Sequence, residues 1–269
     1  MYDKIYFAFS LLLGVVFGSF FNVVVSRPDW YKGRSRCDNC HHTLAWYDLI
    51  PIISYTTLLG KCRYCKKKIP PTHLYAELLC LVAGGTLFLA CRGMDILNII
   101  CCVITVFVLA FDSVSDMDTQ TVFVLPIYVG TVIVAILKGV MLWHDKEFLL
   151  IYASVFALFT IICIALEKPA KNYVGDGDLE MYPLIFLTSP YLGVIILTST
   201  LFLYLKRSTM ERLGVMIYNH SLNTGTVQET NEDTKDVTEE TAEKGIANRR
   251  IAFFPVMFIL YLVFLFIRV

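Results

Sequence analysis

The chain has 269 residues, of which 57% are hydrophobic and only 17% are charged, and its mean hydropathy is +0.63. A water-soluble domain is about half apolar and about one quarter charged, so this composition excludes an ordinary soluble protein and indicates an integral membrane protein. The 23 basic and 23 acidic residues cancel but are segregated along the chain. The net charge therefore gives no indication of a nucleic-acid partner, and none is expected.

Long apolar runs predict an all-α polytopic membrane protein. Residues 1–26, which include "IYFAFSLLLGVVFGSFFNVVV", are expected to span the bilayer, because the run is long enough and no small-residue cleavage site follows it. Further spans are expected over about 74–91, 96–112, 121–141, 148–166 and 251–268. The apolar region from about 179 to 205 contains Ser189 and Pro190, which favour a turn, and we interpret it as two spans. The prediction is about eight transmembrane helices, or seven if this region forms one tilted, kinked helix.

Basic residues in the loops predict the orientation. Segments 27–73 and 206–250 are rich in Lys and Arg, whereas the short loops "CRGMD" and "WHDKE" contain few. Cytoplasmic loops carry the excess of basic residues, so both segments are expected in the cytoplasm and both termini outside. The expected organisation is a first transmembrane helix at 1–26, a compact cytoplasmic domain at 27–73, and a bundle at 74–269 with a polar cytoplasmic linker at 207–250.

Two Cys-x-x-Cys pairs, "CDNC" and "CRYC", lie in the first cytoplasmic segment. Their spacing is typical of a four-thiolate zinc site, and its expected ligands are Cys37, Cys40, Cys62 and Cys65. A reducing compartment argues against disulfides, and so small a segment builds little core without a metal. We predict a structural zinc, or iron in the same ligands, with no open coordination position. The nearby histidines are interpreted as surface residues: His41, His42 and His73. The chain shows no evident internal repeat.

Two acidic clusters lie where apolar runs end or begin: "DSVSDMDTQ" at 112–120, expected between two helices, and "GDGDLEM" at 175–181. Ionisable residues at a membrane boundary are costly and indicate a functional site. Two facing carboxylates share one proton, so that one acts as a base and the other as an acid, as in aspartic proteases. Gly175 and Gly177 would let a substrate backbone approach. The alternative is that these residues are helix caps and boundary charges.

Several segments resemble the type IV prepilin peptidase family. "GSFFNVVVSRP" at 18–28 is similar to its opening signature, residues 34–69 to its cysteine-rich cytoplasmic domain, and "LYAEL" at 74–78 to the entry of its second helix. "GDGDLEM" stands in the place of the family's GxGD motif. The resemblance covers residues 1 to about 205. It implies a multi-pass protein of the cell membrane, an aspartic endopeptidase that cleaves the basic leader of prepilin or pseudopilin substrates at the cytoplasmic face. Many members also methylate the new amino terminus with S-adenosylmethionine.

The resemblance assigns Asp178 as one catalytic acid and favours Asp116 as the other. In the family the first acid lies seven residues before a proline, but here that position is Phe123, so Asp112 stays the alternative. Asp116 also precedes Gln120 with the spacing found in competence-type members from Gram-positive bacteria. The residues assign no site to S-adenosylmethionine.

Three other classes of protein remain as alternatives. A presenilin-like intramembrane protease also uses GxGD, but the last helices here lack its proline-alanine-leucine signature. An ion-coupled transporter predicts inverted repeats or paired broken helices. A zinc-ribbon assembly factor predicts no catalysis. Loss of leader cleavage on replacing Asp178 with Asn would separate the last two from the protease. The sequence gives no indication of the oligomeric state.

Overall fold

The computed structural model describes residues 2–27, 29–170, 178–199 and 253–267. The chain divides into two compact units, residues 1–194 with 252–269, and residues 195–251. Only five residues of the second unit are described, 195–199. Gly175, Gly177 and the expected linker at 207–250 lie outside the described residues.

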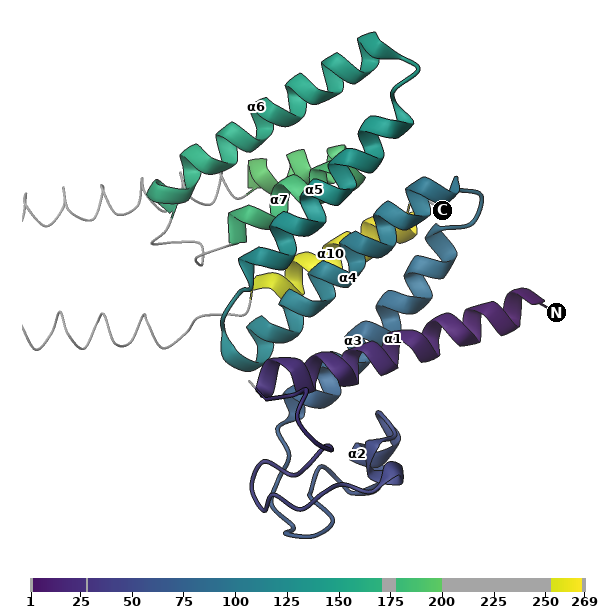
Figure 1. Cartoon of the computed structure of the whole chain (residues 1–269), viewed down its shortest axis with the longest axis vertical. Coiled ribbons are helices and arrows are strands. Elements are labelled where there is room, and N and C mark those ends of the chain that lie inside the picture. The colour runs from purple at the N-terminus through teal and green to yellow at the C-terminus, as the bar shows by residue number, and fades with distance from the viewer. Residues whose placement is uncertain (1, 28, 171–177, 200–252, 268–269) are drawn as a thin grey trace, which may run out of the picture. The chain divides into compact units, whose positions relative to one another are not determined.

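The described residues form helices and no strand, as predicted for an all-α protein (Figure 1). In chain order the elements are α1 (Tyr2–Ser26), η1 (Trp46–Leu49), α2 (Ile53–Thr57), α3 (Pro71–Ala90), α4 (Ile96–Thr119), α5 (Val124–Met141), α6 (Lys146–Ala170), η2 (Asp178–Glu180), α7 (Met181–Thr188) and α10 (Phe253–Ile267). A further apolar helix covers Pro190–Ser199. Residues 27–73 are called the insert below, and the long helices are called the bundle.

Five described helices are long and apolar enough to cross a membrane: α1, α3, α4, α5 and α6. Large apolar side chains are exposed along their outer faces, including Leu150, Ile151 and Leu158 on α6. Lipid covers such a surface, whereas water disfavours it. The eight residues of α7 rise only about 12 Å, against a hydrocarbon core of about 30 Å. The expected count of eight spans is therefore not confirmed.

Helices α1 and α3 pack through small residues. Gly14 and Gly18 form a G-x-x-x-G pair on α1, a pattern that lets membrane helices approach closely. A Cβ atom at Gly14 would lie 2.2 Å from the carbonyl oxygen of Cys80, and one at Gly84 would lie 2.4 Å from that of Ser10. Any larger residue at Gly14 or Gly84 would force the two helices apart.

Helix α4 lies at the centre of the bundle, where it contacts α1, α3, α5, α7 and α10. Half of its apolar stretch is buried, compared with 11% for α6. The helix continues to Thr119, beyond the end expected at about residue 112. The first acidic cluster therefore lies on the last turns of α4, not in the connection that the sequence suggested. Gln120 ends the helix at φ 53°, and its N–H donates to the carbonyl of Asp116 at 3.2 Å.

The last apolar region breaks at the turn that the sequence predicted. Helix α7 ends at Thr188, Ser189 has non-helical dihedral angles, and the next helix begins at Pro190. A Cβ atom at Gly193 would lie 2.9 Å from the Cα of Phe186, so the first turn of the next helix packs closely against α7. All eight residues of α7 are buried, and it contacts α4, α5 and α6. A helix that is apolar on every side belongs inside a bundle.

Candidate metal centre and active site

The two Cys-x-x-Cys segments form equivalent turns. In each, the N–H of the first cysteine donates to the carbonyl five residues later, and the N–H four residues after that cysteine donates back to its carbonyl, at 2.9–3.0 Å. The residues concerned are Cys37, His41 and His42 in the first turn, and Cys62, Lys66 and Lys67 in the second. An isolated bridge closes each turn. The insert thus contains an internal repeat that the sequence did not reveal, because the two turns share only their cysteines.

The four sulfur atoms lie close enough to hold one metal ion. They are all within 4.8 Å of one another, and the Sγ atoms of Cys37 and Cys65 are 3.9 Å apart. Tetrahedral zinc with Zn–S bonds of about 2.3 Å requires sulfurs about 3.8 Å apart. The structure pairs none of these cysteines in a disulfide. The donor set fits a closed, structural zinc site, and the exposed His41 and His42 are not part of it.

The environment prepares one thiol for metal binding. The backbone N–H of Lys67 and the side-chain amide of Asn39 lower the pKa of Cys65 to about 6. The backbone N–H of His42 lowers the pKa of Cys40, but desolvation and the thiols of Cys37 and Cys65 outweigh it and raise the pKa to about 11. One anionic sulfur beside protonated neighbours attracts a cation, and metal binding then displaces the remaining protons.

The charges of the insert favour an anionic metal centre. Its acids Asp29, Asp38 and Asp48 each pair with an arginine, at 2.5–2.8 Å. The Nζ of Lys67 donates to the Oδ1 of Asn39 at 2.7 Å, and the Nδ2 of Asn39 donates to the Sγ of Cys65 at 3.5 Å. Zinc with four thiolates carries a net charge of −2, which a cation at this distance would stabilise.

A buried carboxylate in α3 anchors the insert to the bundle. Glu77 is 9% exposed, and its Oε2 accepts the N–H of Ile52 at 2.7 Å. Beside it, the Nδ2 of Asn22 donates to the carbonyl of His73 at 3.1 Å. The sequence analysis did not identify Glu77 as a functional residue. An acid inside an apolar helix is itself the signal that could have found it, because such a group needs a specific partner.

Asp112 is the most buried of the acids on α4. Its side chain is 0% exposed, and its Oδ1 accepts the N–H of Phe123, which caps α5, at 3.1 Å. Its Oδ2 has no hydrogen-bond partner among the residues that the structure describes. Asp112 therefore ties the end of α4 to the start of α5, with one oxygen left for a further donor.

Asp116 lies one turn further along the same face of α4 and is partly exposed. Asp118 is exposed and accepts the hydroxyl of Ser26 at 3.2 Å, which joins the ends of α4 and α1. Of the three acids on α4, Asp116 thus combines partial access with a position at the end of the helix.

Asp178 begins the short turn η2, which leads directly into α7. The turn contacts α5, α6 and α7, and α7 in turn contacts α4. In Figure 1 the start of α7 and the end of α4 lie at the same end of the bundle. The two segments that carry the predicted acids therefore belong to neighbouring elements of one packed core.

The long apolar helices and the cysteine cluster indicate an integral membrane protein with a small insert whose four cysteines could hold a metal ion. A model of the family described as the Bacterial Peptidase A24 N-terminal domain matches residues 12–91. A Prepilin leader peptidase/N-methyltransferase of Vibrio cholerae is 28% identical over 217 residues, which cover 72% of this chain and 86% of the relative. The protein of that name from Bacillus subtilis is 26% identical over 203 residues, which cover 71% and 75%. That of Myxococcus xanthus is 38% identical over 94 residues, which cover 34% and 27%.

The chain thus matches the A24 family model over residues 12–91 and is similar to prepilin leader peptidase/N-methyltransferases over more than two thirds of its length. This confirms the resemblance that its cysteine, glycine and aspartate motifs indicated. No solved structure matches the chain significantly.

Proposed function

We propose that this protein is a membrane aspartic endopeptidase that cleaves the basic leader of prepilin-like substrates at the cytoplasmic face of the membrane. The observation that carries this proposal is the similarity to two prepilin leader peptidases over more than two thirds of the chain. The packing of α7 against α4 supports it, because the two acidic segments are then near neighbours in the fold.

In the proposed mechanism, Asp116 and Asp178 hold one water between them and share one proton. The ionised carboxylate takes a proton from the water as the oxygen attacks the peptide carbonyl, and the protonated one donates to the carbonyl oxygen. The roles reverse as the tetrahedral intermediate collapses and the amine leaves with a proton. Gly175 and Gly177 leave room for the substrate backbone.

The predicted topology brings the substrate to these acids. A prepilin has its basic leader in the cytoplasm and its apolar helix in the bilayer. The bond between them then lies at the depth of the end of α4. The basic loops of this chain support a cytoplasmic position for that end.

Zinc in the insert would have a structural role. Four thiolates fill a tetrahedral site, which leaves no position for water or substrate. The metal would hold the two turns together, and Glu77 would fix the folded insert against the entry to α3. Substrate cleavage would then depend on the insert through folding and positioning rather than through metal chemistry.

The names of the relatives extend the proposal to methylation of the new amino terminus, with S-adenosylmethionine as the donor. The cavity lined by Asn98, Lys138 and Ser189 offers no carboxylate to the sulfonium or the ammonium group of that cofactor. We therefore derive no step for methylation. Mass measurement of the cleaved product with and without S-adenosylmethionine tests this second activity.

Leader cleavage by the purified full-length chain tests the peptidase proposal. We expect Asp116→Asn and Asp178→Asn each to abolish cleavage to a similar extent, and the double variant to add little, because the two acids act as a unit. Asp145→Asn should cleave normally, because Asp145 lies in the connection between α5 and α6, at the end of α5 away from Asp112 and Asp116. All four variants should retain the metal and the helical content of the parent.

The result at Asp112 distinguishes two forms of the proposal. If Asp112→Asn loses cleavage and Asp116→Asn retains it, the first acid is Asp112, whose Oδ2 has no hydrogen-bond partner in the described part of the chain. If Asp178→Asn and an Asp112→Asn/Asp116→Asn double variant both cleave normally, the aspartic mechanism is wrong.

A further inference from the structure

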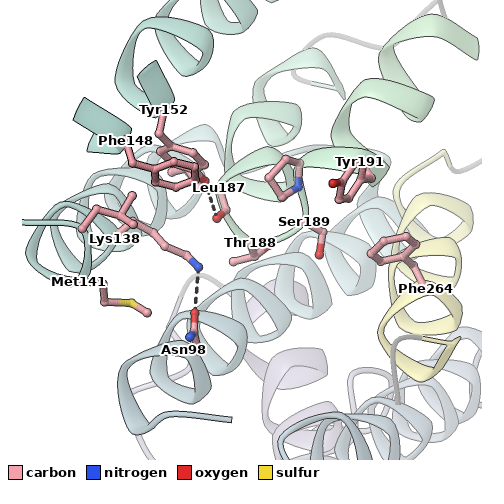
Figure 2. Close-up of a pocket in the computed structure, with 12 residues that line it drawn as sticks. Asn98, Lys138, Met141, Phe148, Tyr152, Leu187, Thr188, Ser189, Tyr191 and Phe264 are labelled. Carbon is pink, nitrogen blue, oxygen red and sulfur yellow. Dashed lines mark hydrogen bonds between the residues drawn. The ribbon is translucent and has the colours of Figure 1, made fainter. Parts of the chain in front are cut away.

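A cavity of about 470 Å³ lies where α4 and α6 begin and where α5 and α7 end. Figure 2 shows Lys138 and Asn98 on one side of it and Ser189 with Tyr191 on the other. Asn98 and Asp116 are about 27 Å apart along α4, at 1.5 Å per residue. The cavity is therefore remote from the proposed catalytic acids, and an inference about it does not rest on the proposed function.

The cavity wall offers hydrogen-bond donors and a positive charge. The Nζ of Lys138 donates to the Oδ1 of Asn98 at 2.9 Å. Among the described residues, this leaves two ammonium hydrogens and the Asn98 Nδ2 available. None of the twelve lining residues is Asp or Glu, and the ion pairs found among the described residues all lie in the insert. A partly buried cation near a membrane is costly without a counter-charge. This wall therefore suits an anion.

Ser189 supplies independent evidence for a ligand. Its side chain is 2% exposed and lines the cavity, yet its Oγ has no hydrogen-bond partner in the described part of the chain. A buried hydroxyl without a partner costs about 1–3 kcal/mol. Its backbone is already satisfied, since its N–H donates to Ile185 and its carbonyl accepts from Gly193. Only the hydroxyl is left to bind a ligand in the cavity.

The remaining lining is apolar and aromatic, as expected at a membrane boundary. Met141, Phe148, Tyr191 and Phe264 lie around the cavity, and the first three lie at helix ends, where aromatic residues meet lipid headgroups. A volume of this size suits a small organic ligand rather than a single inorganic ion. An anionic group with an attached apolar part would satisfy both kinds of wall.

We propose that this cavity binds the phosphate headgroup of an anionic phospholipid. Lys138, Asn98 and Ser189 donate hydrogen bonds to the phosphate oxygens, and the aromatic rim contacts the glycerol and the first acyl carbons. Basic pockets between membrane helices bind anionic headgroups in this way. With the orientation predicted from the loop charges, the lipid belongs to the outer leaflet.

Native mass spectrometry of the full-length chain in detergent tests this proposal. The probes are phosphatidylglycerol, phosphatidylcholine and inorganic phosphate, each titrated separately. We expect one tightly bound phosphatidylglycerol per chain, with Lys138→Gln weakening its binding about tenfold, because a charge-assisted hydrogen bond is lost. Ser189→Ala should weaken binding by a smaller factor without lowering the thermal stability of the lipid-free protein, since it removes an unsatisfied hydroxyl.

Two controls keep the test independent of folding and of general surface charge. Lys138→Arg retains the charge and should retain binding. Lys146→Gln makes the same charge change at an exposed position at the same end of the bundle, and should leave binding within about twofold. Equal losses in Lys138→Gln and Lys146→Gln would overturn the site. Binding of inorganic phosphate as tight as that of the lipid, or equal affinity for phosphatidylcholine, would overturn its assignment to an anionic phospholipid.

Discussion

The insert and the bundle reach ordered structures by opposite means. In the insert, residues far from any large core are held by two equivalent hydrogen-bonded turns, three ion pairs and a tight group of four sulfurs. In the bundle, order comes from close contact: glycines let α1 and α3 touch, and α7 is buried on every side. The insert depends on a few specific ligands, whereas the bundle depends on shape.

This difference determines how each region responds to a change. Removing one ligand from a metal site removes a free energy that no neighbouring residue can replace. Removing or adding a few atoms in a packed core costs a smaller amount that depends on how far the surroundings can relax. Glu77 joins the two regions, so a substitution of this bundle residue tests how far the order of the insert depends on the bundle.

The largest effect is expected from loss of the metal. Structural zinc contributes about 10–16 kcal/mol in small zinc-binding peptides, so Cys62→Ser should unfold the insert while the bundle keeps its structure. Hydrogen exchange of the full-length chain should show loss of protection near Cys37 and Cys62 and unchanged protection in α5 and α6. Metal analysis should give one zinc or iron per chain in the parent and none in the variant. If the metal-free Cys62→Ser variant retains this protection, the insert does not need a metal in order to fold.

A second, smaller effect tests shape in the bundle. Gly14→Ala places a Cβ atom 2.2 Å from a backbone oxygen of α3, and such overpacking costs about 1–3 kcal/mol. Gly139→Ala is the matched control, because a Cβ atom there meets nothing within 4 Å; it should be neutral or stabilise α5 by up to about 1 kcal/mol. Thermal unfolding of both variants should give opposite shifts. Equal shifts would mean that α1 and α3 are not in close contact.

The comparison also explains what the sequence could predict. The clustering of the four cysteines follows from their spacing, since a Cys-x-x-Cys pair forms its turn from local backbone hydrogen bonds. Long spans follow from apolar runs, because the bilayer sets their length. The break at Ser189 and Pro190 follows from the fixed geometry of proline.

Tertiary contacts set the features that the sequence left open. The end of α4 was placed too early because acidic residues are poor transmembrane residues, yet Asp112 is buried there with the N–H of Phe123 as its partner. That partner is eleven residues away, beyond any helical periodicity. The role of Glu77 depends likewise on the backbone of a distant loop. The spacing of these acids along the sequence is therefore not enough to choose between Asp112 and Asp116 as the first catalytic acid.

A third prediction concerns the anchor between the two regions. Glu77→Ala removes the acceptor of the Ile52 N–H, and loss of a buried hydrogen bond of this kind costs about 1–3 kcal/mol. We expect faster amide exchange around α2 while the metal stays bound. Glu77→Gln keeps an oxygen acceptor and should restore most of the protection. If Glu77→Ala leaves exchange around α2 unchanged, the insert is held to the bundle by other contacts.

The smallest effect tests whether the two cysteine turns are equivalent. His41 and Lys66 occupy the same place in the two turns, and both have a positive φ, 55° and 61°. Residues with a side chain are strained in this region, whereas glycine is not. His41→Gly should therefore stabilise the insert by up to about 1 kcal/mol, seen as slower metal loss to a chelator. Lys66→Gly should show a smaller gain, because it also removes a cation near the sulfurs.

The reverse change in the same insert completes this test. Gly33 has φ 84° and a Cβ atom there would meet nothing within 4 Å, so Gly33→Ala adds backbone strain without a clash. We expect it to speed metal loss by about as much as His41→Gly slows it. If His41→Gly instead speeds metal loss, the histidine side chain stabilises its turn by more than the strain costs, and the two turns are equivalent in backbone geometry but not in energy.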